Sequence, residues 1–148
     1  MKRLILLVLL AALLYSMSSG GGGRERDGDP PIDGVDGLHV LIVEESQDRH
    51  KLSQDKMAVL TGGDVRAWLK ANTDEDGDGA KGFRFWDQDQ LKSLENESDE
   101  WQAIGNFALS ADTPAPPWIL VADGAATTIQ PLPEDPEATV DFLEAWAD

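Results

Sequence analysis

The chain contains no cysteine, only two histidines, and 12 basic residues against 28 acidic ones. Without a thiolate, disulfide exchange and every other cysteine-dependent reaction are excluded. Without thiols, and with only the distant His39 and His50, the sequence supplies no set of ligands for zinc. The formal charge of −16 repels phosphate backbones and anionic lipid, which argues against nucleic-acid binding and against docking on a membrane surface.

The N-terminus has the composition of a targeting segment. Residues 1–3 are Met-Lys-Arg, residues 4–15 form an uninterrupted apolar run, and small residues surround a possible cleavage point after Ser18. This pattern predicts a secretory signal over residues 1–18, with export to the periplasm or the extracellular space. The alternative is an uncleaved membrane anchor, although the apolar run would span only about 18 Å as a helix, against a hydrocarbon core of about 30 Å.

Residues 19–37 are dominated by glycine, proline and aspartate, and Ile32 and Val35 are their only clearly apolar side chains. Such a segment buries too little surface to offset its ordering entropy, so we expect a flexible linker. The remaining residues, 38–148, have the usual size of one domain with a single core. An exported domain without cysteine forgoes disulfides, so packing alone must hold it together.

Three stretches predict β-strands. The first, 38–45, is aliphatic and β-branched with acidic residues only at its end, which is typical of a strand buried on both faces. The second, 82–87, alternates aromatic and polar residues. The third, 116–130, predicts a hairpin whose two strands meet at Asp123-Gly124.

The other segments predict helices, each preceded by a residue whose side chain can cap free backbone N–H groups. The expected helices are 54–60 after Ser53, 65–71 after Asp64, a helix after Ser98, and 137–146 after Asp135. Strands that alternate with helices in this order imply a mixed sheet with helices on both faces. The tryptophans fall at helix and strand positions, where we expect core packing.

The order of the last elements (proline, buried strand, Asp-Gly hairpin, strand, closing helix) resembles the C-terminal half of a thioredoxin fold. Pro117 stands just before the third strand, where thioredoxin-like proteins carry a cis-proline beside the active site. The resemblance implies an α/β three-layer sandwich with a central mixed sheet of about four strands. At the place of the family's Cys-x-x-Cys pair the chain reads Glu-Glu-Ser-Gln-Asp-Arg-His over residues 44–50. The resemblance therefore implies a member without redox activity.

The segment 44–50 supports two hypotheses. The resemblance implies a protein-binding or assembly module, because the corresponding surface in the family binds extended peptides. Its binding residues would be Glu45, Ser46, Asp48, Arg49, Pro117 and Trp118, with Trp86 nearby. The alternative is a cysteine-free hydrolase in which Ser46 is the nucleophile and His50 is the base, oriented by Asp48. The spacing of these residues does not by itself enforce that geometry.

A second acidic segment, 72–79, resembles the start of a calcium loop. Asp74, Asp76 and Asp78 would be the first three ligands, with Gly79 at the turn. The closing position, which needs a bidentate glutamate, is Phe85. A weak calcium site is therefore a third hypothesis, and a turn-rich acidic loop is the simpler interpretation.

Overall fold

The computed structural model describes residues 28–147, so the predicted signal and the first part of the predicted linker lie outside the described residues. The described chain forms a four-stranded sheet in the order β2-β1-β3-β4. β1 pairs in parallel with β2 and antiparallel with β3, which in turn pairs antiparallel with β4. The prediction of a mixed α/β fold with about four strands is confirmed. The strands are β1 (His39–Glu44), β2 (Phe83–Asp87), β3 (Trp118–Ala122) and β4 (Thr127–Pro131).

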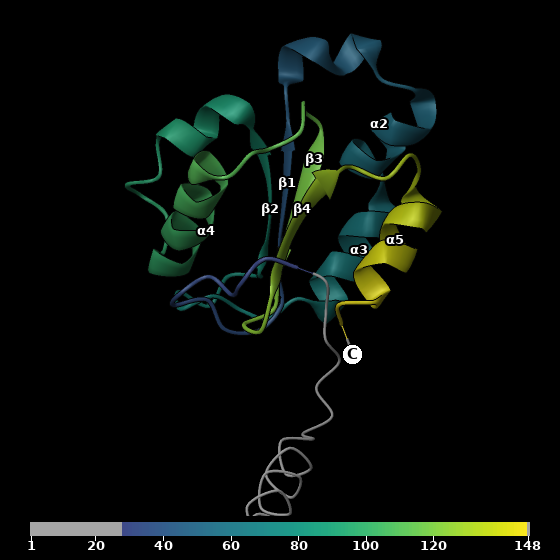
Figure 1. The fold of residues 1–148 in the computed structure, drawn as a ribbon. Coiled ribbons are helices and arrows are strands. Elements are labelled where there is room, and N and C mark those ends of the chain that lie inside the picture. The colour runs from purple at the N-terminus through teal and green to yellow at the C-terminus, as the bar shows by residue number, and fades with distance from the viewer. Residues whose placement is uncertain (1–27, 148) are drawn as a thin grey trace, which may run out of the picture.

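Helices cover both faces of the sheet (Figure 1). One face carries α2 (Gln54–Thr61), α3 (Gly63–Asn72) and α5 (Pro136–Glu144), and the other carries α4 (Asp99–Ser110). Two 3-10 helices, η1 (Ser46–Lys51) and η2 (Gln88–Lys92), directly follow the strands β1 and β2. Because parallel strands end at the same edge of a sheet, η1 and η2 lie at the same end of the molecule.

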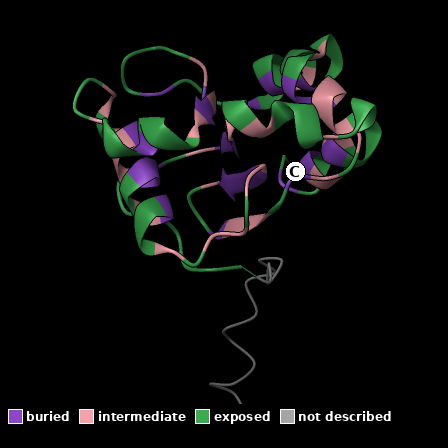
Figure 2. Cartoon of the chain, turned by 90° about the horizontal axis from the view of Figure 1, so that it is seen from above, coloured by how far each residue is buried: buried purple, intermediate pink, exposed green. Residues whose placement is uncertain are grey.

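β1 is the centre of the core, because all six of its residues are buried. Its side chains alternate between two apolar clusters: Val40 and Ile42 pack with α2, α3 and α5, whereas Leu41 and Val43 pack with α4. A strand between two helical layers has no solvent-facing side, which explains its continuous aliphatic sequence. Figure 2 shows the same distribution, with buried residues on the strands and on the inner sides of the helices.

Four of the five tryptophans are core residues, as predicted, and Trp68 is half-buried against the cluster of α2, α3 and α5. Trp86, Trp101 and Trp118 are at most 4% exposed and share the cluster beneath α4. The rings of Trp86 and Trp101 meet edge to face, with centroids 5.7 Å apart. Trp146 is 9% exposed and closes the opposite cluster behind α5.

Two of the predicted helix caps are confirmed: Ser53 and Asp135 accept backbone N–H groups of α2 and α5 at 3.1 and 2.8 Å. The predicted Asp64 cap is wrong, because α3 begins at Gly63 and Asp64 lies in its first turn, where its charge complements the helix dipole. Ser98 occupies the cap position of α4, but its side chain makes no capping hydrogen bond.

Residues 28–37, which the sequence assigned to the linker, pack on the domain. Asp29 and Thr127 exchange two backbone hydrogen bonds of 2.8 and 2.9 Å at the outer edge of β4. Ile32 and Val35 are 8% and 3% exposed and belong to the cluster beneath α4. Residues 28–37 are therefore not a free linker, because Ile32 and Val35 are buried in the core and anchor the segment to the domain.

We predict that Ile32→Ala lowers the free energy of unfolding by about 2 kcal/mol, because it deletes buried methyl groups from the cluster beneath α4. Chemical denaturation measures the change. Asp33→Ala, at an exposed neighbouring position, is the matched control and should change stability by less than about 0.5 kcal/mol. Equal effects of the two substitutions would show that this segment does not contribute to the core.

Candidate functional site

The predicted binding loop forms the regular turn η1 at the end of the sheet. The Glu45 carboxylate accepts the Gln47 N–H at 3.5 Å, and the Glu45 carbonyl accepts the Asp48 N–H at 2.9 Å. The Leu52 N–H donates to the Arg49 carbonyl at 3.1 Å and closes the other end. None of the residues of η1 is buried. The sequence indicates only a polar segment without a helix here, but these local hydrogen bonds make it a 3-10 helix.

An ion pair fixes the base of η1. Glu44, the last residue of β1, is only 6% exposed. Nε of Arg49 donates to Oε2 of Glu44 at 2.6 Å, and Nη2 of Arg49 donates to Oε1, which gives a two-pronged contact. Hydrogen bonding to Glu44, together with its charge, raises the pKa of Arg49. The positive charge of Arg49 compensates the Glu44 carboxylate, which is largely removed from water.

Asp87, at the end of β2, is the second anchor of η1. Its Oδ2 accepts the Ser46 N–H at 2.9 Å, and its Oδ1 accepts the Asp89 N–H at 3.1 Å. The Gln90 side chain accepts the Asp87 N–H at 2.9 Å, which completes a capping box for η2. Hydrogen bonds from the Ser46 hydroxyl, from its N–H and from the Asp89 N–H lower the pKa of Asp87. Burial opposes this shift, and the charge of Arg49 adds to it.

The chain enters β3 beside the same anchors. The Pro116-Pro117 peptide bond is cis. The register pairs Val43 with Trp118, so the antiparallel alignment places Pro117 next to Glu44. The Pro117 carbonyl accepts the Leu132 N–H at 3.1 Å. Because proline has no backbone N–H, neither Pro116 nor Pro117 can donate a backbone hydrogen bond to a binding partner.

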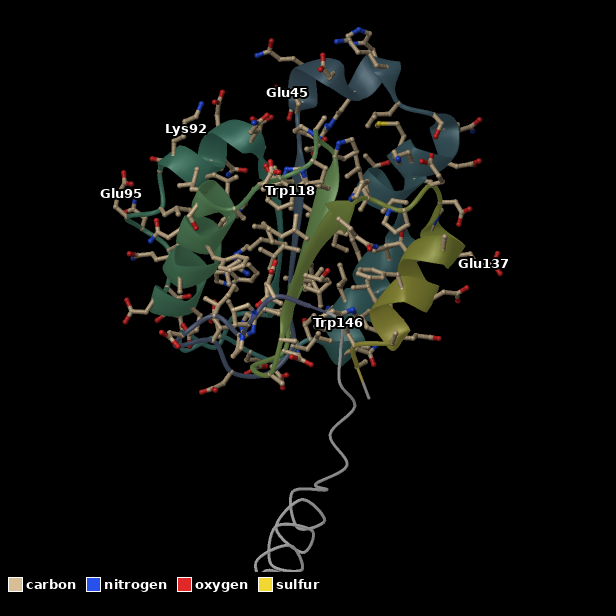
Figure 3. The ribbon with its side chains drawn as sticks, viewed as in Figure 1. Glu45, Lys92, Glu95, Trp118, Glu137 and Trp146 are labelled. Carbon is tan, nitrogen blue, oxygen red and sulfur yellow. The ribbon has the colours of Figure 1, made fainter. Side chains whose placement is uncertain are left out.

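The structure brings five of the six predicted binding residues to one exposed or half-exposed region, and buries the sixth. We call Glu45, Ser46, Asp48, Arg49 and Pro117 the η1 surface. Trp118 is only 1% exposed and packs beneath α4, so a partner on the η1 surface does not reach it. Figure 3 shows Glu45 at the rim, whereas Trp118 lies farther down, beside the sheet. Trp118 is not available for binding because helices cover both faces of β3, so that all five residues of this strand are buried.

The residues of the hydrolase hypothesis do not form a catalytic relay. His50 Nδ1 lies 2.9 Å from the Gln47 carbonyl, and Asp48 pairs with Lys51 at 2.6 Å. A serine nucleophile needs a base within hydrogen-bonding reach, held by an orienting group. Within the described chain, no hydrogen bond joins His50 to either Ser46 or Asp48.

In the acidic segment, Asp76 has a structural position. Its side chain is 1% exposed, and Oδ1 accepts the N–H groups of Asp78 and Ala80 at 3.1 and 2.8 Å. Oδ2 accepts Nη2 of Arg84 at 3.2 Å and the Ser98 hydroxyl at 3.4 Å. Burial acts to raise the pKa of Asp76, but these hydrogen bonds and the charge of Arg84 outweigh it, so the pKa lies below its ordinary value.

The other two predicted calcium ligands do not join Asp76 in a cluster. The Asp74 carboxylate accepts the Leu38 N–H at 2.7 Å, and Asp78 is exposed. Residues 28–147 contain no group of three or more acidic or histidine side chains arranged to hold a metal ion. The Asp74 carboxylate binds a backbone N–H just before β1, and the Asp76 carboxylate binds two in the turn between α3 and β2. Both lie at the end of the sheet opposite η1. Sequence reasoning missed the roles of Arg84 and Ser98, because 8 and 22 residues separate them from Asp76.

Comparisons with protein-family models, curated proteins and solved structures found no match for this chain. In the part of the chain that the structure describes, no helix has the length and apolar character needed to cross a membrane.

We predict that Arg49→Met lowers the free energy of unfolding by about 1–2 kcal/mol, because it leaves the buried Glu44 carboxylate without its partner. Denaturant titrations of Arg49→Met, Glu44→Gln and the double variant form a double-mutant cycle. We expect the double variant to be more stable than the sum of the single losses implies. Additive losses would mean that the pair does not fix η1.

We predict that Asp76→Asn lowers the free energy of unfolding at pH 7 by about 1–3 kcal/mol, since it removes the charge opposite Arg84. Asp78→Asn is the exposed control, with a change below about 0.5 kcal/mol. Because folding lowers the pKa of Asp76 below 3.8, its contribution is present above that pH and lost as the pH falls through the folded pKa. The gap between wild type and Asp76→Asn should therefore narrow in acid, and a gap independent of pH would contradict the assignment.

Proposed function

We propose that this chain is an exported thioredoxin-like domain without redox activity, which binds a protein partner through the η1 surface. Strand order and direction support the thioredoxin-like part: two parallel strands joined through helices, then an antiparallel hairpin and a closing helix. The cis bond before β3 lies where the resemblance implies a cis-proline. Export rests on the signal-like composition of residues 1–18.

The observation that carries the binding role is the ordering of η1. Fixing the backbone of each residue costs roughly 1–2 kcal/mol of conformational entropy, and none of the residues of η1 is buried to offset it. The anchors are instead the partly desolvated Glu44–Arg49 pair and the Asp87 carboxylate. An exposed turn held in one conformation by supporting side chains adds little to the core, but it is well suited to recognition.

The chemistry of the η1 surface favours a polar partner. Glu45 and Asp48 present carboxylates, and the Arg49 side chain remains 45% exposed beside Glu44. Leu109, on α4, is the one exposed large hydrophobic residue among those that the structure describes. Without an exposed aromatic or aliphatic anchor, affinity at this surface must come from hydrogen bonds and charge, which is typical of small, transient interfaces.

Site-specific photo-crosslinking in the producing cells tests this proposal. With a benzophenone amino acid at Ser46 we expect one discrete cross-linked protein, and its yield should fall several-fold when Glu45→Lys reverses a charge beside it. The control carries the same photo-crosslinker at Lys70, an exposed position on α3 near the opposite end of the sheet. Identical products from both positions, or none from Ser46, would refute binding at the η1 surface.

A further inference from the structure

On the outer edge of β4, one residue has backbone groups that no other residue of the range 28–147 binds. Thr127 exchanges both of its backbone hydrogen bonds with Asp29, so its N–H and carbonyl point away from β3. Residues of an antiparallel strand alternate in this respect, so the N–H and carbonyl of Ile129 point to the same outer edge. Among the described residues, no backbone hydrogen bond to these two groups occurs. Ile129 therefore leaves one donor and one acceptor on this edge, where an added strand would pair.

A cleft of about 410 Å³ lies against this edge. Ile129 and Phe107 give it an apolar lining, and both side chains are only partly buried against the core. Asp29 and Pro30 line it from the N-terminal segment, and Asp112 lines it from the end of α4. The cleft thus combines apolar contacts with a strand edge that can hydrogen-bond to a peptide backbone, which are the two requirements for binding an extended segment.

The electrostatics of the cleft favour a cation. α4 ends beside it, and the last turn of this helix contains no basic residue to balance the negative end of the helix dipole. Asp29 and Asp112 are both exposed and add two carboxylates. Three sources of negative potential therefore converge on a cleft that also has apolar walls. A lysine or arginine side chain provides both the aliphatic stem and the charge that such a cleft accommodates.

We propose that the cleft between β4 and α4 binds an extended segment of a partner protein that pairs with Ile129 and places a lysine or arginine beside Asp112. A second copy of this chain is disfavoured as the occupant, because each copy carries a formal charge of −16 and would bring the same carboxylates to the contact. This surface is separate from the η1 surface, and its test does not depend on the partner proposed there.

The probe is a capped, alternating peptide, Thr-Val-Arg-Val-Lys-Val-Thr, titrated into the isotopically labelled protein at low salt. We expect the Ile129 amide resonance to shift and its hydrogen exchange to slow. The Thr128 amide, which points inward to β3, serves as the internal reference. Asp112→Lys should weaken binding about tenfold. Asp64→Lys, the same charge change beside a different cleft, should leave the affinity within about twofold.

Two further peptides separate strand addition from general attraction. A version with glutamate in place of arginine and lysine should not bind, and a version with alternate backbone amides methylated should lose the Ile129 shift. Equal binding by the methylated peptide, or equal weakening by Asp64→Lys and Asp112→Lys, would overturn the proposal. So would a failure of the basic peptide to bind, or a slowing of Ile129 exchange that rises with protein concentration alone, which would indicate self-association.

Discussion

The burial of β1 on both faces is the constraint on which the rest of the structure depends. The neighbouring elements are all placed by their contacts with β1. β2 and β3 pair with its two edges, and two helical layers cover its alternating side chains. A chain without cysteine has no disulfide to hold these layers together. The side chains of β1 therefore join the two apolar clusters. The positions of both ends of the sheet depend on this strand.

At each end of the sheet, an arginine compensates a carboxylate removed from solvent. Glu44 with Arg49 stabilises η1 at one end, and Asp76 with Arg84 stabilises the acidic turn at the other. Arg84 also lies 4.8 Å from the centre of the Trp101 ring, so it connects the acidic turn to the core. In a chain with 12 basic residues against 28 acidic ones, these contacts give two arginines a defined structural role.

The two surfaces that we propose for binding differ in physical character. The η1 surface is a polar rim on a preorganised turn, with charges of both signs. The cleft between β4 and α4 combines apolar walls with two exposed carboxylates, and the edge of β4 beside it has free backbone groups at Ile129 among the described residues. In these proposals the cleft holds an extended basic segment, and the η1 surface binds a polar partner protein. Neither surface uses thiol chemistry, which agrees with the absence of cysteine from the whole chain.

The sequence determined the elements whose signals are local. The aliphatic run of β1, the hairpin at Asp123-Gly124, and the caps Ser53 and Asp135 were readable because each depends on a few consecutive residues. The φ of +79° at Gly124 is one such case, since only glycine adopts it without strain. The five residues of the η1 surface were suggested by the resemblance rather than by a local pattern, and the fold brings them to one end of the sheet.

Tertiary structure decided everything that joins distant residues. Trp118 faces the core because β3 is paired in the sheet. Ile32 and Val35 pack into the cluster beneath α4, although no local sequence pattern predicts their burial. The sequence makes Asp76 a candidate calcium ligand, whereas only the fold shows that its oxygens accept hydrogen bonds from Arg84 and from N–H groups of its own turn. Sequence patterns record which side chains are available, but the competition among partners is settled only when the folded chain brings them within reach.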